Sequence, residues 1–223
     1  MIILGLSGKK QSGKDTLCTY IQTLLYSFYN EQDIKVYSFA DKLKQLCIEI
    51  LGLTYDQCYG TDEDKNTLTI YKWENLSKEI RHKNKLRYEY ATNGEICDII
   101  LPTGFMTARE ILQIVGTDIF REMFSTDIWV DATFRDINKA QKSVNIITDA
   151  RFPGEIKSIL DYNGYVIRLT RNILYDKHES EIALDHYDFN QKNICIIDNQ
   201  DKDINYKNKE AAKYISSILA PTE

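Results

Sequence analysis

A glycine- and lysine-rich segment near the N-terminus has the composition of a phosphate-binding loop. Gly8-Lys9-Lys10-Gln11-Ser12-Gly13-Lys14 has the spacing G-x-x-x-x-G-K, and it lies between the apolar run Ile2–Leu6 and an amphipathic segment. Glycines let successive backbone N–H groups point at phosphate oxygens, and a following helix adds the positive end of its dipole. The residues predicted to form the nucleotide-binding site of this loop are Gly8, Lys10, Gln11, Ser12, Gly13, Lys14, Asp15 and Thr16. Lys14 can reach the β- and γ-phosphates as a point charge.

The residue after Lys14 departs from the usual pattern of such loops. Asp15 stands where Ser or Thr commonly binds Mg²⁺, and Thr16 comes one position later. A carboxylate facing phosphates would repel them, so we expect Asp15 to point towards an acceptor molecule or a cation. The alternative is that Asp15 only supplies favourable charge in the first turn of a helix.

A second charged group follows the apolar run Val144–Thr148. Asp149 stands directly after this run, and Arg151 comes two residues later. Ligands of open parallel sheets bind outside the carboxyl ends of the strands. Asp149 is therefore a candidate acid for Mg²⁺, and Arg151 is a candidate for binding an acceptor phosphate with its planar guanidinium. A plain surface arginine is the alternative for Arg151.

A polar segment after the run Tyr165–Thr170 is a candidate lid. Phosphoryl transfer needs positive charge on the moving group and exclusion of water, and a loop at this place could supply both. We predict a lid over residues 171–187 that carries Arg171. Arg168 lies within the apolar run and is expected to point into the structure instead.

The elements that must position these residues alternate between short apolar runs and helical patterns. Strands are predicted at Ile2–Leu6, Lys35–Phe39, Val144–Thr148, Tyr165–Thr170 and Ile194–Ile197. Helices are predicted at Lys14–Tyr29, from Asp41 to Leu51, from the capping box Thr107-Ala108-Arg109-Glu110 onward, at Trp129–Phe134 and at Lys207–Leu219. Near-continuous apolar strands that alternate with helices indicate an α/β fold with a parallel sheet covered on both faces.

Residues 54–102 interrupt this alternation. The segment is polar, rich in Tyr and charged in both signs, and it is too long for a simple loop. We predict an inserted, mostly helical region at 54–135 that binds an acceptor, within a single domain of 1–223. The basic run Arg81–Arg87 is interpreted as a solvated surface rather than a phosphate site.

Composition narrows the class of protein. The chain has 28 Lys and Arg against 33 Asp and Glu, a net charge of −5, which argues against a general nucleic-acid binder. No run of about 18 apolar residues predicts a membrane span, and the N-terminus has the character of a buried strand rather than a signal peptide. The five cysteines contain no Cys-x-x-Cys pair, which favours reduced thiols in the cytoplasm.

Taken in order, these motifs resemble bacteriophage-type deoxynucleoside monophosphate kinases. The segments that carry the resemblance are the loop 8–16, Phe39-Ala40-Asp41-Lys42-Leu43-Lys44, Thr107–Glu110 with Val115–Asp118, Trp129-Val130-Asp131, Thr148–Glu155 and His178-Glu179-Ser180-Glu181. The resemblance implies a P-loop nucleoside monophosphate kinase fold with a five-stranded parallel sheet and a helical insertion. It also implies ATP-dependent conversion of a deoxynucleoside monophosphate into the diphosphate.

The resemblance also assigns roles to residues by their position. Lys14, Asp149, Arg151 and Arg171 would be catalytic; Asp15, Asp41, Lys42, Arg109, Asp118, Trp129, Asp149 and Arg151 would bind the acceptor; and Thr16 and Asp149 would hold Mg²⁺. A phage-encoded member would work in the host cytoplasm, and the resemblance favours a homodimer. Neither nucleic acid nor a membrane is an expected partner.

Three other classes share the loop and remain alternatives. A kinase of another small molecule, similar to dephospho-coenzyme A kinase, would use the same fold. A regulatory GTPase would carry Asn-Lys-x-Asp, but Asn138-Lys139-Ala140-Gln141 lacks the Asp. A P-loop ATPase module usually has an acid after its strand-end Asp, whereas Ala150 follows Asp149 here.

Overall fold

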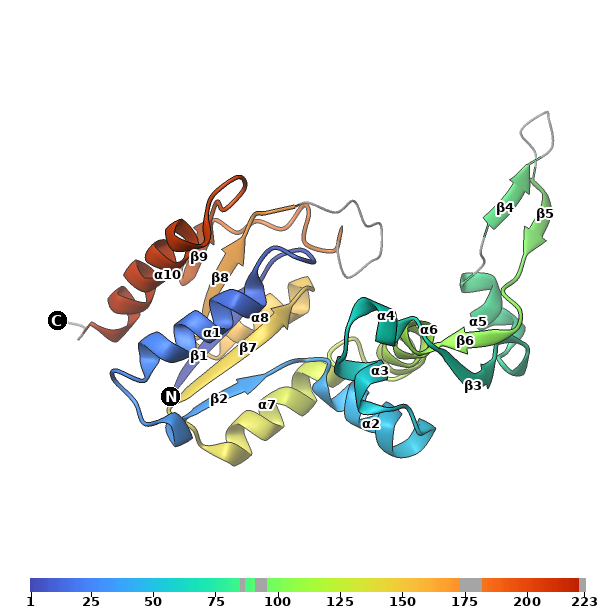
Figure 1. The fold of residues 1–223 in the computed structure, drawn as a ribbon, viewed down its shortest axis with the longest axis horizontal. Coiled ribbons are helices and arrows are strands. Elements are labelled where there is room, and N and C mark those ends of the chain that lie inside the picture. Colours follow the sequence, from blue (N-terminus) through green and yellow to red (C-terminus); the bar gives the residue numbers. More distant parts are fainter. Residues whose placement is uncertain (85–86, 91–95, 173–181, 221–223) are drawn as a thin grey trace. The chain divides into compact units, whose positions relative to one another are not determined.

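The computed structural model describes residues 1–84, 87–90, 96–172 and 182–220. The chain forms two compact units, the first made of Met1–Asp41 with Trp129–Glu223 and the second of Lys42–Ile128 (Figure 1). Residues 173–181, with His178 and Glu181, lie outside the described residues, so most of the predicted lid does as well. No helix within the described ranges has both the length and the apolar character needed to cross a membrane.

The first unit is built on a five-stranded sheet. Its strands are β1 (Ile2–Ser7), β2 (Ile34–Tyr37), β7 (Val144–Ala150), β8 (Tyr165–Leu169) and β9 (Ile194–Ile197), in the order β2-β7-β1-β8-β9. Every neighbouring pair is parallel. The predicted α/β fold with a five-stranded parallel sheet is therefore confirmed.

Helices cover both faces of this sheet (Figure 1). The helices α1 (Lys14–Leu25) and α10 (Ile204–Leu219) pack on one face, and α7 (Ile128–Ala140) and α8 (Pro153–Asp161) pack on the other. Side chains alternate along each strand, so Leu4 contributes to the first core and Ile3 to the second. Burial on both faces is the reason that the strands are apolar almost throughout.

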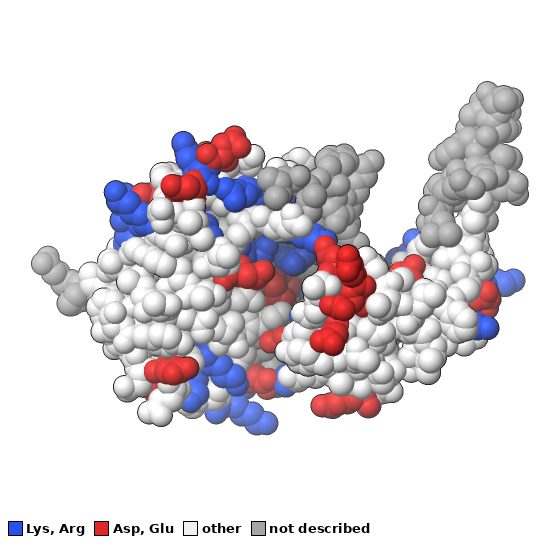
Figure 2. All heavy atoms as spheres, in the orientation of Figure 1, with Lys and Arg blue, Asp and Glu red and all other residues white. Residues whose placement is uncertain are grey.

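The strand order brings the predicted site residues to one edge. Because β1 lies between β7 and β8, the register pairs Ser7 at the end of β1 with Ala150 and with Arg168. The loop after β1 therefore emerges beside the end of β7, which carries Asp149 and is followed by Arg151, and beside the end of β8, which is followed by Arg171. In Figure 2 Lys and Arg side chains of this unit lie over the edge from which the loops after β1 and β9 emerge, with Asp and Glu among them.

The second unit mixes helices with two small antiparallel strand pairs. Its elements are α2 (Asp41–Leu51), α3 (Tyr55–Tyr59), α4 (Asp62–Lys65), β3 (Leu68–Lys72), the 3₁₀ turn η2 (Trp73–Asn75), α5 (Lys78–Lys83), β4 (Arg87–Tyr90), β5 (Ile96–Ile100), β6 (Phe105–Thr107), α6 (Ala108–Gln113) and the π-helical segment η3 (Ile114–Arg121). The pairs are β3 with β6 and β4 with β5.

The second unit spans Lys42–Ile128, whereas the predicted insertion spans residues 54–135. Cys47 of α2 is buried in the core of the second unit, together with Trp73 and Ile111. Val130 and Phe134 of α7 instead pack in the core beneath the sheet. The second unit therefore begins with α2 and ends before α7.

Several predicted element boundaries were wrong. The first helix ends at Leu25 rather than Tyr29, and the predicted short piece Trp129–Phe134 is part of the 13-residue helix α7. The last helix begins at Ile204, because Asp203 caps it by accepting a hydrogen bond from the Tyr206 N–H at 2.7 Å. The capping box at Thr107 is present as predicted, but its helix changes to π geometry from Ile114.

Candidate active site

The loop between β1 and α1 has the tight backbone that its glycines permit. Gly13 has φ of +95°, in the left-handed region, and it caps the start of α1. A Cβ on Gly8 would lie 2.5 Å from Oγ of Ser12, so only glycine fits there without a shift. The Ser12 N–H donates to the Lys9 carbonyl at 3.1 Å, and Oγ of Ser12 is buried without a hydrogen-bond partner.

Lys14 places its ammonium inside this loop. Its Nζ donates to the carbonyl oxygens of Gly8 at 2.6 Å and of Lys9 at 2.8 Å, and the residue is 7% exposed. A buried ammonium held by two carbonyl groups lies ready to bind a stronger, anionic acceptor. This is the position in which a phosphate-binding lysine is needed.

The two residues after Lys14 differ in their surroundings. Asp15 is exposed in the first turn of α1. The Thr16 hydroxyl donates to the Gly13 carbonyl at 3.0 Å and accepts from Nζ of Lys207 at 2.6 Å. Thr16 is therefore bound to an ammonium group of the C-terminal helix.

Asp149 binds the loop that follows β2. Its Oδ1 accepts from the Phe39 N–H at 2.7 Å, and its Oδ2 accepts from Oγ of Ser38 at 2.6 Å and from the Ala40 N–H at 3.1 Å. In the same loop, Oδ2 of Asp41 accepts from the Ser38 N–H at 2.9 Å. The carboxylate at the end of β7 thus holds the segment Ser38–Ala40 in place.

These contacts bear on the predicted Mg²⁺ site. Both oxygens of Asp149 are engaged by loop donors, and the oxygen of Thr16 is engaged by a cation. A divalent ion bound directly to Thr16 would also be repelled by the Lys207 ammonium. The predicted Mg²⁺ site at Thr16 and Asp149 therefore stays a prediction, with both side chains hydrogen-bonded to protein groups in this structure. Across the parts of the chain that the structure describes, no group of three or more His, Cys, Asp or Glu side chains could hold a metal ion.

Three arginines stand at the same edge of the sheet. Arg151 directly follows β7, and its backbone N–H donates to Oε2 of the buried Glu155 at 2.7 Å. Arg168 donates from Nη1 to Oγ of Ser7 at 3.0 Å. Arg171 donates from Nε to the Asn199 carbonyl at 3.2 Å and from Nη2 to the Lys202 carbonyl at 2.5 Å. The predicted lid arginine thus lies against the loop between β9 and α10.

The other predicted acceptor residues fall in both units. Asp41 and Trp129 belong to the first unit, and Lys42, Arg109 and Asp118 belong to the second. Arg109 donates to Oδ1 of Asp62 at 2.7 Å and to Oδ1 of Asn66 at 3.0 Å, and Nζ of Lys42 donates to Oε1 of Gln45 at 3.3 Å. Trp129 is 6% exposed on α7.

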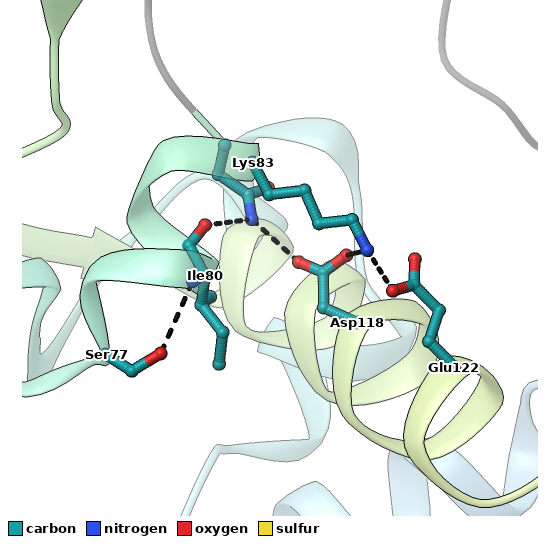
Figure 3. A network of polar contacts seen from close by, with 6 residues as sticks. Ser77, Ile80, Lys83, Asp118 and Glu122 are labelled. Atoms are coloured by element: carbon teal, nitrogen blue, oxygen red, sulfur yellow. Dashed lines mark hydrogen bonds and ion pairs between the residues drawn. The ribbon is translucent and has the colours of Figure 1, made fainter.

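Asp118 joins the π-helical segment to α5. Its Oδ2 accepts from Nδ2 of Asn84 at 2.7 Å, and its Oδ1 lies 3.9 Å from Nζ of Lys83. Lys83 also pairs with Glu122, one turn further along (Figure 3). Within the second unit, Asp118 is therefore held by two residues at the end of α5, Asn84 and Lys83.

Comparison with known proteins supplies the family. Residues 65–209 match the model of the deoxynucleotide monophosphate kinase family. This chain belongs to the deoxynucleotide monophosphate kinase family. It is similar to the deoxynucleoside-5'-monophosphate kinase of Escherichia phage T5, with 26% identity over 212 residues that cover 83% of this chain and 82% of that protein. It is also similar to a protein of Acanthamoeba polyphaga mimivirus, provisionally named deoxynucleotide monophosphate kinase, with 28% identity over 201 residues and 82% of each chain.

Membership of this family confirms the predicted resemblance and the enzyme class. The protein is a kinase that phosphorylates deoxynucleoside monophosphates. The viral and phage relatives agree with the predicted phage-type sequence.

Two distant residues, Asn199 and Lys207, contact the loop between β1 and α1, and neither contact was predicted from the sequence. Asn199, which is 1% exposed, donates from Nδ2 to the Ser12 carbonyl at 2.9 Å. Lys207, which is 4% exposed, donates to both Gly13 and Thr16. A signal for Lys207 was present, because it stands four and eight residues before Ala211 and Ile215 on the buried face of α10.

Proposed function

We propose that this kinase transfers the γ-phosphoryl group of ATP to a deoxynucleoside monophosphate, with the ATP phosphates bound by the loop 8–16. The observation that carries this proposal is the buried ammonium of Lys14 inside that loop, at the N-terminus of α1. An incoming phosphate replaces the Gly8 and Lys9 carbonyls as the partner of Lys14. Loop N–H groups and the unpartnered hydroxyl of Ser12 are available to the same anion.

The transfer is an in-line displacement. An oxygen of the acceptor's α-phosphate attacks the γ-phosphorus of ATP, the bond from that phosphorus to the β,γ-bridging oxygen breaks, and ADP leaves. The attacking oxygen is already ionised at neutral pH, so no strong general base is needed. Catalysis then consists of positioning and charge neutralisation, for which we propose Lys14, Arg151 and Arg171.

The lid role proposed for Arg171 requires an exchange of partners. Its guanidinium must leave the Asn199 and Lys202 carbonyls to reach a phosphate. Phosphate is the stronger partner because a charge-assisted, bidentate contact replaces hydrogen bonds to neutral carbonyl groups. Residues 171–187 stay the proposed lid.

Magnesium has a limited place in this proposal. We expect any Mg²⁺ to arrive with ATP and to be held by phosphate oxygens and water, which is common for this ion. It would supply charge neutralisation on the phosphates, and no step depends on a direct contact with Thr16 or Asp149.

The acceptor residues are a proposal as well. Asp15, Asp41, Lys42, Arg109, Asp118, Trp129, Asp149 and Arg151 are assigned to the deoxynucleoside monophosphate by resemblance. Among them, Arg151 has the planar guanidinium suited to a phosphate and stands at the carboxyl end of β7. Replacing Arg151 by Ala should raise the KM for the acceptor and lower kcat while the KM for ATP stays within about twofold. A change confined to the KM for ATP would contradict this assignment.

The decisive experiment is a coupled ADP-release assay over deoxy- and ribonucleoside monophosphates, with dephospho-coenzyme A and an acceptor-free reaction beside them. We expect turnover with deoxynucleoside monophosphates. Lys14→Ala should lower kcat at least ~100-fold, because the transition state loses a buried positive charge. The matched control is Lys213→Ala, which removes an exposed lysine that pairs with Glu210. Near-normal turnover of the Lys14 variant, or ADP release without any acceptor, would overturn the proposal.

The cellular setting remains an expectation. The described cysteines Cys18, Cys47, Cys58 and Cys195 are all thiols rather than disulfides, which suits a reducing cytoplasm. We propose the cytoplasm as the location, and the host cytoplasm if a phage encodes the enzyme.

A further inference from the structure

The C-terminal helix α10 carries a lysine on its buried face. Lys207 is 4% exposed and shares this face with Ala211 and Ile215, which pack in the core on the sheet. Lysine is almost never buried unless its ammonium has partners. One of these partners is Thr16, which lies 191 residues earlier in the chain.

The ammonium of Lys207 is held at the junction of the phosphate-binding loop and α1. Its Nζ donates to the Gly13 carbonyl at 2.9 Å and to Oγ1 of Thr16 at 2.6 Å. The Thr16 hydroxyl donates to the same Gly13 carbonyl at 3.0 Å, which closes a ring of three polar groups. A Cβ on Gly13 would lie 3.0 Å from Nζ of Lys207, so the ammonium sits against the loop itself.

Stability of the unliganded fold does not explain a cation at this place. The N-terminus of a helix carries positive potential, which disfavours an ammonium. Burial lowers the pKa of Lys207, the charge of Arg171 lowers it further, and Asp15 opposes both. A desolvated cation near a second cation at a helix N-terminus is unfavourable until an anion binds nearby. An anion bound at the loop would therefore offset this cost.

We propose that Lys207 is a positioning residue for the phosphate donor. It fixes the Gly13 carbonyl and the Thr16 hydroxyl, and thereby the first turn of α1, and it adds positive charge beside the loop that binds the ATP phosphates. This inference rests on the proposed binding of ATP by the loop 8–16. It makes α10 a working part of the donor site rather than only a cover for the sheet.

The loop can fold without this ammonium. The Gly13 carbonyl also accepts from the Leu17 N–H at 3.1 Å and from the Thr16 hydroxyl, so it keeps two donors when Lys207 is removed. The Thr16 hydroxyl loses its donor Lys207, but Thr16 is exposed and water can replace that donor. A methionine at position 207 keeps the apolar stem of the side chain and removes the buried charge. Lys207→Met should therefore fold, with a melting temperature equal to that of the wild type or higher.

The test measures ATP binding by calorimetry without an acceptor, together with initial rates. Lys207→Met should weaken ATP binding and raise the KM for ATP by about tenfold, because the bound phosphates lose a nearby positive charge and the first turn of α1 loses an anchor. The KM for the deoxynucleoside monophosphate should change by less than about twofold. Lys207→Arg should recover part of the ATP affinity because it keeps the charge. The control Lys209→Met changes an exposed lysine of the same helix and should leave both constants unchanged.

The outcomes separate this inference from the proposed function. If the wild type binds ATP and Lys207→Met binds it equally well, the role of Lys207 is overturned and the function stands. If the wild type does not bind ATP, both fall. Should Lys207→Met not fold, Lys207→Gln replaces it, since Gln keeps a donor for the Gly13 carbonyl without the charge. Wild-type ATP affinity in Lys207→Gln would overturn the role of the charge.

Discussion

Two charged side chains at the edge of the sheet, Asp149 and Lys14, form hydrogen bonds with loop segments. Asp149 holds the Ser38–Ala40 segment, and Lys14 holds the carbonyls of its own loop. The consequences differ, because the Lys14 partners are neutral carbonyl groups that phosphate can replace. Asp149 instead accepts from two backbone N–H groups and a hydroxyl, and we propose that it positions the Ser38–Ala40 segment.

This difference can be tested at Asp149. Asp149→Asn replaces one of the two acceptor oxygens by an NH₂ donor, so at least one of the N–H groups of Phe39 and Ala40 loses its acceptor. We expect the acceptor KM to rise and kcat to fall by about tenfold, the effect of losing a hydrogen bond to a charged group. The Mg²⁺ concentration at half-maximal rate should stay unchanged. Both quantities come from initial rates over a Mg²⁺ series.

The matched variant for this test is Ser38→Ala. It removes a second partner of Asp149 in the same loop but leaves the carboxylate in place. It should change the acceptor KM in the same direction, by less. If the Mg²⁺ concentration at half-maximal rate rises in Asp149→Asn but not in Ser38→Ala, Asp149 binds the metal ion and this expectation is wrong.

Among the elements, α6 shows how a short sequence signal starts a helix. Oγ1 of Thr107 accepts from the Glu110 N–H at 3.2 Å, and Oε2 of Glu110 accepts from the Thr107 N–H at 2.7 Å. This reciprocal pair satisfies two backbone donors that would otherwise lack partners. The helix then widens to π geometry at Ile114–Arg121, where Gly116 lies against Leu43 so closely that a Cβ would be 2.6 Å from Cδ2. The close packing of α2 on this segment was not evident from periodicity.

The capping box predicts a measurable stability effect. Thr107→Ala should lower the unfolding free energy of the second unit by about 1 kcal/mol, whereas Thr107→Ser should lower it by much less. Urea unfolding should be followed by fluorescence of Trp73, which is buried in the core of that unit, in a background with Trp129→Phe. An Ala variant as stable as the Ser variant would show that the cap contributes nothing.

For the whole molecule, the two units each enclose their own buried thiols. Burial raises the pKa of Cys18 in the first unit to about 11 and that of Cys47 in the second to about 12, with smaller contributions from Asp15 and from Cys58. An unfolded thiol ionises near pH 9, so folding stability should decline as the pH rises above that value towards the folded pKa.

The thiols therefore predict a pattern of chemical reactivity. At pH 8 about one in a thousand Cys18 side chains is a thiolate in the native enzyme, against about one in ten when unfolded. Alkylation with iodoacetamide, followed by mass spectrometry of peptides, should modify Cys18 and Cys47 in urea at least ~100-fold faster than in buffer. Equal rates in urea and in buffer would mean that the folded units already expose these thiols.

The predicted homodimer is tested separately, by sedimentation velocity of the native, unalkylated enzyme.

Local pattern in the sequence was sufficient for the five strands of the parallel sheet, the glycine-rich loop after β1, the capping box and the family resemblance. Each depends on neighbours within a few residues: alternation of apolar side chains, glycines at a turn, or a cap three residues from its partner. The partners of the charged side chains depended on tertiary structure. Ser38 and Asp149 are 111 residues apart, and Thr16 and Lys207 are 191 apart. Such pairs form only when the strand order and the packing of α10 bring distant segments together, and local periodicity carries no information about that packing.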